Sequence, residues 1–185
     1  LGQIRARYPD GLRELPPHAG IEGAITDDTQ MTLFTAEGLI RAHVRGLLKG
    51  ISGSGVVHHA LLRWLVTQGE RPVIKVDREA GLVRDQRLQA CRAPGMTCLS
   101  ALRSTTRFGE RAKNDSKGCG TIMRVAPVGF FMSRPAVREV AIETSAYTHG
   151  HRTGQLAAAA WAELLADVLA GKRPAHAARD LASEY

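Results

Sequence analysis

Apolar residues recur at steps of three and four in four stretches of the 185-residue chain, which is the spacing of amphipathic helices. The first stretch follows Thr29, and its predicted buried face comprises Leu33, Ala36, Ile40, Val44 and Leu47. The second stretch ends near Gly69, and its predicted buried face comprises Val57, Ala60, Leu61, Trp64 and Leu65. Glycines at positions 50, 53 and 55 separate the two predicted helices.

The second half of the chain predicts two further helices. Ser133 is a candidate N-cap, and Pro135 sits in the first turn, where the missing N–H of proline costs nothing. The predicted buried face of this helix comprises Val137, Val140, Ala141 and Thr144. In the last helix it comprises Ala157, Ala160, Trp161, Leu164, Leu165, Val168 and Leu169. Gly171 and Pro174 are the stop signals of that helix.

No alternation of apolar and polar residues is long enough to predict a β-sheet. Residues 70–96 contain the short apolar run VIKV, for which a strand and an extended loop with one helical turn are equally good interpretations. The length of the chain suits one domain with a real core. We therefore predict a single all-α domain over residues 1–185.

Charge and cysteine content narrow the function classes. The formal charge of +7 comes with scattered arginines, so it favours a phosphate-bearing ligand and makes a basic nucleic-acid binder the weakest of the functions considered. Three cysteines without C-x-x-C spacing indicate reduced thiols in a cytoplasmic protein. No apolar run approaches the length of a membrane span. We expect neither a nucleic acid nor a membrane as partner.

Two adjacent carboxylates, Asp27 and Asp28, stand between two threonines directly before the first predicted helix. One interpretation is an ordinary helix start, because Thr26 or Asp27 could cap the helix and acidic residues suit its positive end. The other is a site for hard divalent cations, in which Thr26 supplies a hydroxyl and the aspartates supply carboxylates. A cap made by one carboxylate does not exclude cation binding by the other.

A second candidate site lies in the sequence NDSKGCGTIMRVAPVGF, residues 114–130, where Gly118 and Gly120 flank a cysteine before a short apolar segment. These glycines would let backbone N–H groups approach an anion at a helix start. A plain loop between helices explains the glycines equally well. Lys117 and Arg124 add positive charge, which favours a phosphate-bearing ligand.

A third candidate lies in the sequence SAYTHGHRTG, residues 145–154, where His149 and His151 are two positions apart in a loop. This spacing lacks the i, i+4 arrangement and the cysteine partners that zinc sites use. For His149, polar contact with a ligand and the pairing of carbonyl groups at a helix end both remain open.

Together the three stretches resemble the ADP-ribosylglycohydrolase family, which includes dinitrogenase reductase-activating glycohydrolase and the ADP-ribosyl-acceptor hydrolases. The matching pieces are TDDTQM at residues 26–31, GCGTIMRVAPVG at 118–129 and SAYTHGH at 145–151, in the order and spacing of the family. Three ordered motifs are far more specific than one, so the resemblance favours the cation site over a helix cap alone.

The resemblance implies a compact orthogonal multi-helix bundle that hydrolyses the bond between ADP-ribose and a modified protein side chain, using two Mg²⁺ or Mn²⁺ ions. It implies metal binding by Thr26, Asp27 and Asp28, with both aspartates also acting in catalysis. Water activated by the ions would attack the anomeric carbon of the ribose. Arginine-linked acceptors and immunity against an ADP-ribosylating toxin are candidate settings. The resemblance assigns substrate binding to Ser116, Lys117, Gly118, Cys119, Gly120, Met123 and His149.

Two departures from the family pattern affect the functional prediction. Cys119 stands where the family usually has asparagine, and a thiol donates a weaker hydrogen bond than an amide. The family also has a GD-A-G segment upstream and a Gly-Asp-x-Asp-[ST] segment downstream that supplies further metal ligands, and neither is among these 185 residues. We expect the 185 residues to be part of a longer polypeptide. The alternative is a member with half a metal site, which would bind ADP-ribose or a modified protein without cleaving it.

Overall fold

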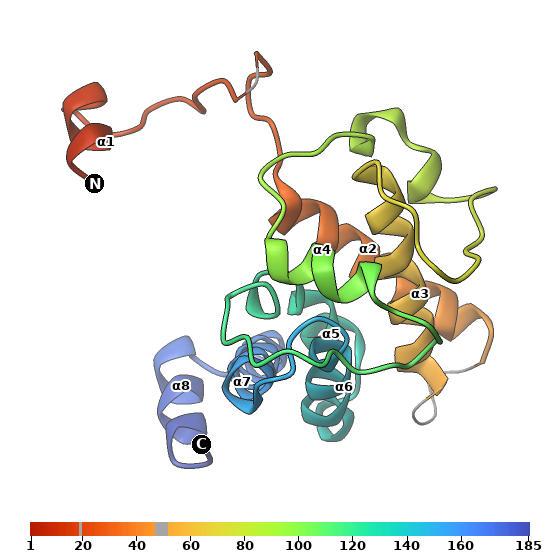
Figure 1. Ribbon diagram of the computed structural model, residues 1–185. Helices are drawn as coiled ribbons and strands as arrows, with labels where there is room; N and C mark the ends of the chain where they lie inside the picture. The colour runs from red at the N-terminus through yellow and green to blue at the C-terminus, as the bar shows by residue number, and fades with distance from the viewer. Residues whose placement is uncertain (19, 47–51) are drawn as a thin grey trace.

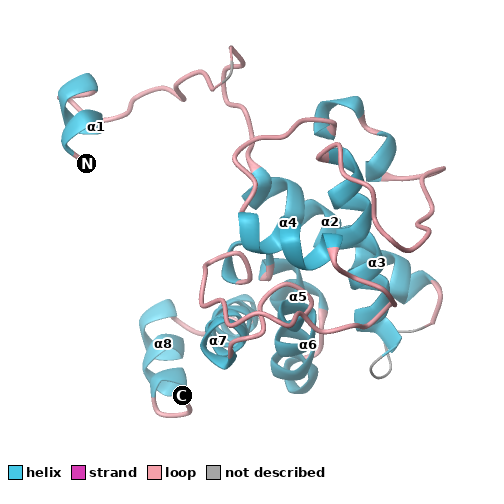
Figure 2. Ribbon diagram, in the orientation of Figure 1, coloured by secondary structure: helices cyan, strands magenta, loops and turns pink. Residues whose placement is uncertain are grey.

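The computed structural model describes residues 1–18, 20–46 and 52–185, and its folded body is built from helices (Figures 1 and 2). Within these ranges there is no β-strand, only an isolated antiparallel bridge between His18 and Ile21. The prediction of an all-α fold is therefore confirmed. Among the helices of the described ranges, none combines the length and the apolar character needed to cross a lipid bilayer.

The chain order of the helices is simple, and their bounds follow here as a list. The α-helices are α1 (Gly2–Arg7), α2 (Asp27–Val44), α3 (Ser52–Thr67), α4 (Met96–Arg103), α5 (Ala126–Phe131), α6 (Arg134–Ala146), α7 (Arg152–Leu169) and α8 (Pro174–Ala182). The 3₁₀ turns are η1 (Leu82–Arg84), η2 (Gln86–Leu88) and η3 (Ile122–Arg124). Residues 70–95 thus form extended chain with two 3₁₀ turns, and the strand interpretation of VIKV is wrong.

Two groups of helices form the body of the molecule (Figure 1). In one group α2 packs along α3, and in the other α5 and α6 pack on α7. Glycines allow the closest approaches between helices. A Cβ atom on Gly38 would lie 2.6 Å from the Cα of Val57, and one on Gly129 would lie 2.3 Å from the carbonyl oxygen of Ala162. Both distances are far below van der Waals contact, so these two crossings require glycine.

The predicted buried face of α3 is confirmed, and so is that of α6 except that Val140 is half-buried; the predicted face of α2 is wrong. Leu33, Ile40 and Val44 are exposed, and Leu47 lies outside the described residues. The buried apolar residues of α2 are instead Met31, Phe34, Leu39 and Ala42. Apolar residues occur on two faces of this helix. The face that contains Gly38 is buried, because only glycine lets the backbone of α3 come so close.

The predicted buried face of α7 is also wrong, because apolar residues again occur on two faces of the helix. Trp161 and Leu169 are exposed, and the buried residues are Gly154, Ala158, Ala159, Ala162 and Glu163. Ala162 lies against Gly129 of α5, and Glu163 pairs with Arg134 and Arg138 of α6. Trp161 and Leu164 line an apolar groove beside α8. Pro174, predicted as a stop signal, is the first residue of the next helix, α8.

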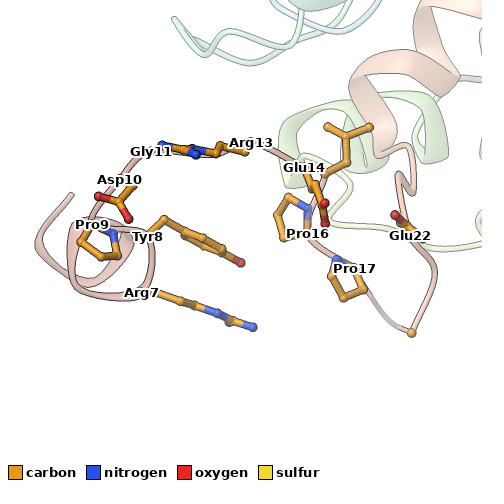
Figure 3. A pocket seen from close by; sticks show the side chains of 12 residues that line it. Arg7, Tyr8, Pro9, Asp10, Gly11, Arg13, Glu14, Pro16, Pro17 and Glu22 are labelled. Carbon is orange, nitrogen blue, oxygen red and sulfur yellow. The ribbon is translucent and has the colours of Figure 1, made fainter.

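An N-terminal arm, made of residues 1–18 and 20–25, extends away from the helical body and carries α1, which has no buried residue (Figure 1). The arm curls around a hollow of about 700 Å³ (Figure 3), lined by side chains between Arg7 and Glu22. None of the predicted site residues lines this hollow. The candidate chemistry therefore lies elsewhere, in the helical body.

Candidate active site

The acidic pair lies at the first turn of α2, which begins at Asp27 with Thr26 in the N-cap position. The Thr26 side chain makes no capping hydrogen bond, and its Oγ1 donates to Asp28 Oδ2 at 2.9 Å instead. Asp28 is exposed, whereas Asp27 is only 6% exposed. The hydroxyl and the Asp28 carboxylate are thus grouped beside Asp27, and Thr26 does not act as an ordinary side-chain cap.

Asp27 is an electrostatically strained carboxylate. Burial raises the pKa of Asp27, and the neighbouring charge of Asp28 raises it further, while a hydrogen bond from the backbone N–H of Gly95 opposes both effects. That bond reaches Asp27 Oδ2 at 2.9 Å. The net upward shift means that the fold disfavours the ionised form of Asp27. A cation beside the pair would relieve this strain.

The acidic pair has the donor chemistry of a site for one hard cation. Mg²⁺ is usually held by one or two carboxylates, with substrate oxygens and water in the other positions. Asp27, Asp28 and Thr26 supply two carboxylates and a hydroxyl, which fits this pattern. In the described ranges, no group of three or more histidine, cysteine or acidic side chains is placed to hold a metal ion. Binding of a second ion stays a prediction.

The first turn of α4 connects the acidic pair with the glycine loop, residues 114–120. Gly95, just before α4, donates its N–H to Asp27. Thr97 Oγ1 lies 3.2 Å from Ser116 Oγ of the loop, and Cys98 Sγ lies 3.9 Å from the carbonyl oxygen of Gly120. Sequence reasoning missed this helix. The only available signal was Pro94-Gly95 before a short apolar stretch.

Asn114 fixes the glycine loop to the segment that follows α6. Its Nδ2 donates to the carbonyl oxygen of Thr148 at 2.9 Å, and its Oδ1 accepts from the N–H groups of Ser116 and Gly150, each at 3.1 Å. A Cβ atom on Gly150 would overlap the carbonyl oxygen of Asn114. The loop therefore sits directly against residues 148–150, which joins the second and third motifs.

The loop contains backbone N–H groups that make no hydrogen bond within the described part of the chain. Gly118 donates its N–H to Ser116 Oγ at 3.2 Å. The N–H groups of Lys117, Cys119 and Gly120 find no acceptor among the residues that the structure describes. Lys117, Gly118 and Cys119 are exposed. Unpaired backbone N–H groups in a glycine-rich loop are the kind of donor that holds phosphate.

His149 lies beneath this loop and is 1% exposed. A Cβ atom on Gly118 would lie 3.3 Å from His149 Nε2, and one on Gly120 would lie 3.2 Å from it. The other ring nitrogen, Nδ1, lies 2.9 Å from Thr148 Oγ1, so the ring pairs with a hydroxyl and not with helix carbonyl groups. Burial, assisted by the positive charge of Arg124, lowers the pKa of His149 to about 4. His149 is therefore neutral at neutral pH.

The remaining residues of the motifs, and the cysteines, have the following contacts. Thr32 Oγ1 lies 2.7 Å from the carbonyl oxygen of Asp28 and 3.0 Å from that of Met123, which ties α2 to the turn after the loop. The Met123 side chain is half-buried and packs against the core. All three cysteines are free thiols, with Cys91 and Cys119 exposed and Cys98 buried. His151 caps α7, because its Nδ1 accepts from the N–H of Thr153.

The three motifs thus meet around the start of α4, and they place paired carboxylates near the glycine loop. Fold and site together define an all-α protein suited to a phosphate-bearing ligand. The family model for ADP-ribosylglycohydrolase matches residues 1–185, and the chain belongs to this family. Members of the family are glycohydrolases of ADP-ribosylated substrates and generally depend on metal ions, so this chain falls in the hydrolase class. Searches of curated proteins and of solved structures found no match.

Proposed function

We propose that this protein hydrolyses the glycosidic bond between ADP-ribose and a modified protein side chain, and so reverses mono-ADP-ribosylation. One observation carries the proposal: the start of α4 contacts Asp27 through the N–H of Gly95 and the glycine loop through Thr97. A single substrate could therefore meet the acidic pair and the anion-binding N–H groups at the same time. ADP-ribose has the required chemistry, with a diphosphate at its centre and a ribose at the reacting end.

The acidic pair would hold Mg²⁺ or Mn²⁺ through Thr26, Asp27 and Asp28, and the proposal includes two ions. A divalent ion bound there supplies Lewis-acid chemistry, since it orients ribose hydroxyl groups and lowers the pKa of bound water. The family relationship and the raised pKa of Asp27 support this role. The exposed Asp28 carboxylate would stabilise the positive charge that develops on the ribose as the glycosidic bond breaks.

The glycine loop would position the substrate. The backbone N–H groups of Lys117, Cys119 and Gly120 would donate to the diphosphate, with the Lys117 ammonium group adding charge. Ser116 would hold the loop in shape, because its Oγ accepts from Gly118 and contacts Thr97. Fixing the diphosphate holds the anomeric carbon near the acidic pair, and such orientation lowers the barrier to attack by water.

The first test is release of free ADP-ribose from an arginine-ADP-ribosylated protein, with Mg²⁺ or Mn²⁺ and with a chelator control. We expect release that needs both the ion and Asp27, so Asp27→Asn should lose it. Asp10→Asn, which removes an exposed carboxylate of the N-terminal arm, is the matched control and should retain wild-type activity. Release that persists in chelator and in Asp27→Asn would contradict the metal-dependent mechanism. Serine-linked and arginine-linked substrates compared side by side would identify the acceptor.

A second candidate function is a binding module that holds ADP-ribose or a modified protein without cleaving it. It is favoured by the observation that, in the described part of the chain, no third acidic, histidine or cysteine side chain joins the pair at a metal site. Calorimetric titration with ADP-ribose separates the two functions. Binding that is indifferent to chelator and to Asp27→Asn, together with no release, would support the module.

A further inference from the structure

The helical body contains a buried cation, Arg124, that the proposed mechanism does not use. Arg124, in η3, is 0% exposed, and within the described ranges it makes no ion pair with a carboxylate. Its Nη2 donates to the carbonyl oxygen of Thr144 at 2.9 Å and to Thr148 Oγ1 at 3.0 Å. Its Nε and Nη1 are buried without a partner. Burial of an unbalanced guanidinium group is unfavourable, so its position needs a reason.

The C-terminal end of α6 gives part of that reason. Thr144 contributes one of the last carbonyl groups of α6, where the helix dipole concentrates partial negative charge. Arg124 therefore binds a helix end in place of a carboxylate. Its second contact, Thr148, lies in the segment that carries His149. Arg124 is thus placed to control the hydrogen bonds of that segment.

The donor properties of arginine decide where the Thr148 proton goes. A guanidinium group only donates, so Thr148 Oγ1 must accept from Arg124 and direct its own proton elsewhere. Three acceptors lie near it: the carbonyl oxygen of Ser145 at 3.4 Å, His149 Nδ1 at 2.9 Å, and the Cys98 sulfur, which accepts only weakly. The first distance is at the long limit of a hydrogen bond, and the second is ordinary. These distances favour donation by the Thr148 hydroxyl group to His149 Nδ1.

This assignment fixes the tautomer of His149. A neutral imidazole carries one N–H, and Nδ1 is occupied as an acceptor, so the proton resides on Nε2. Nε2 is the nitrogen that lies against Gly118 and Gly120, and it has no hydrogen-bond partner in the part of the chain described. We propose that Arg124 and Thr148 are positioning residues that turn His149 Nε2–H into a donor toward a diphosphate held in the glycine loop. This inference rests on the proposed function.

Because the His149 ring is neutral, its tautomer determines which ring nitrogen can donate a hydrogen bond. A charged imidazolium would have N–H groups on both nitrogens, and its orientation would not depend on Thr148. Arg124 disfavours that state through its own charge, in addition to the effect of burial. The same residue therefore keeps the ring neutral and sets which nitrogen donates. A donor to phosphate is obtained without burying a second positive charge.

The first test needs neither ligand nor turnover. Nitrogen-15 NMR of the histidine side chains, in the free protein at neutral pH, reports which ring nitrogen carries the proton. His149→Gln identifies the signals of His149 among those of the seven histidines. We expect the proton on Nε2. A proton on Nδ1 in the wild-type protein would overturn the inference, whatever the protein binds.

Two variants of Thr148 then test the relay. Thr148→Val keeps the shape of the side chain but removes the hydroxyl group, so protonation of Nδ1 should become populated. Thr148→Ser restores the donor and should restore the wild-type tautomer. The affinity for ADP-ribose should fall about tenfold in Thr148→Val, the worth of one neutral hydrogen bond, and should stay near wild type in Thr148→Ser. An unchanged tautomer in Thr148→Val, or a changed tautomer with unchanged affinity, would overturn the inference.

Failure of the proposed function gives a different result. If the wild-type protein does not bind ADP-ribose, the proposed ligand is wrong, while the tautomer and its dependence on Thr148 are still measured directly. Thr148→Ser also serves as the folding control, because the hydroxyl partner of Arg124 is retained. A structural role alone would lower the stability of Thr148→Val without moving the proton between the ring nitrogens.

Discussion

Gly120→Ala should disturb the candidate site by steric overlap alone. A Cβ atom at this position would lie 2.7 Å from Cys98 Sγ and 2.8 Å from His149 Cε1. Non-bonded heavy atoms pack best at roughly 3.5–4.0 Å, so both contacts would be too short by about 1 Å. Cys98 and His149 are each 1% exposed and cannot swing into solvent. The loop must therefore shift outward, away from α4.

The expected magnitude follows from the packing. Overpacking of a buried site lowers the free energy of unfolding by about 1–3 kcal/mol. Gly118→Ala is the matched control, because its Cβ atom would meet His149 Nε2 only at 3.3 Å and Ser116 Oγ at 3.4 Å. Both substitutions restrict the unfolded chain to a similar extent, so their difference isolates the overlap. We expect Gly118→Ala to change the free energy of unfolding by no more than about 0.5 kcal/mol.

Urea denaturation of a double-mutant cycle provides the assay. In the Cys98→Ala background the sulfur is gone, so Gly120→Ala should cost at least about 1 kcal/mol less than in the wild type. The overlap with the His149 ring remains, and rescue should be partial. Equal costs in the two backgrounds, or equal effects of Gly118→Ala and Gly120→Ala, would refute the described contact between loop and α4. ADP-ribose binding should weaken in Gly120→Ala and recover in part in the double variant.

Three further predictions concern charge, pH and helix packing. The pKa of Asp27 is raised in the fold, so the stability that its protonated form contributes is lost as pH rises. Asp27→Asn should therefore raise the melting temperature at pH 7 in chelator. The same substitution should abolish any increase in melting temperature caused by Mn²⁺. Burial lowers the pKa of His58 to about 4 from 6.5, so the stability that His58 contributes above pH 6.5 should be lost toward pH 4. Urea denaturation at several pH values should show that His58 accounts for about 3 kcal/mol of the fall. Gly129→Ala should separate α5 from α7 and lower the free energy of unfolding by about 3 kcal/mol. The Cβ atom of Gly55→Ala would meet nothing within 4 Å, so this variant should raise the free energy of unfolding by about 0.5–1 kcal/mol in the same assay.

The candidate site was largely predictable because each motif is local. Adjacent residues such as Asp27 and Asp28 stay adjacent in any fold, and glycines on both sides of Cys119 predict an unobstructed backbone. What joins the motifs was not predictable. Gly95 acts through its backbone N–H and Cys98 through a packing contact, and neither role depends on a side-chain pattern that a sequence displays. The eight residues of α4 are also too few for a periodic signal.

The helices were predictable from their periodicity, but their orientation was not. In α2 the apolar residues form two faces, and Phe34 and Ile40 are equally plausible as core residues from spacing alone. The choice depends on how closely a second helix can approach, which Gly38 decides together with Val57 of α3. Contact between two backbones is a property of a pair of elements. Periodicity describes one element at a time.

The buried charges of the protein separate structural from functional positions. Glu163, 2% exposed in α7, accepts from Arg134 at 2.7 Å and from Arg138 at 3.1 Å, so its charge is balanced within the fold. Asp27 and Arg124 are buried without such balance among the described residues, and both lie at the candidate site. Local rules that are broken without compensation concentrate at functional sites. A cation would relieve the unbalanced carboxylate, and the unbalanced guanidinium group would order Thr148 and His149 beneath the loop. The two unfavourable buried charges would then serve the two ends of one proposed substrate.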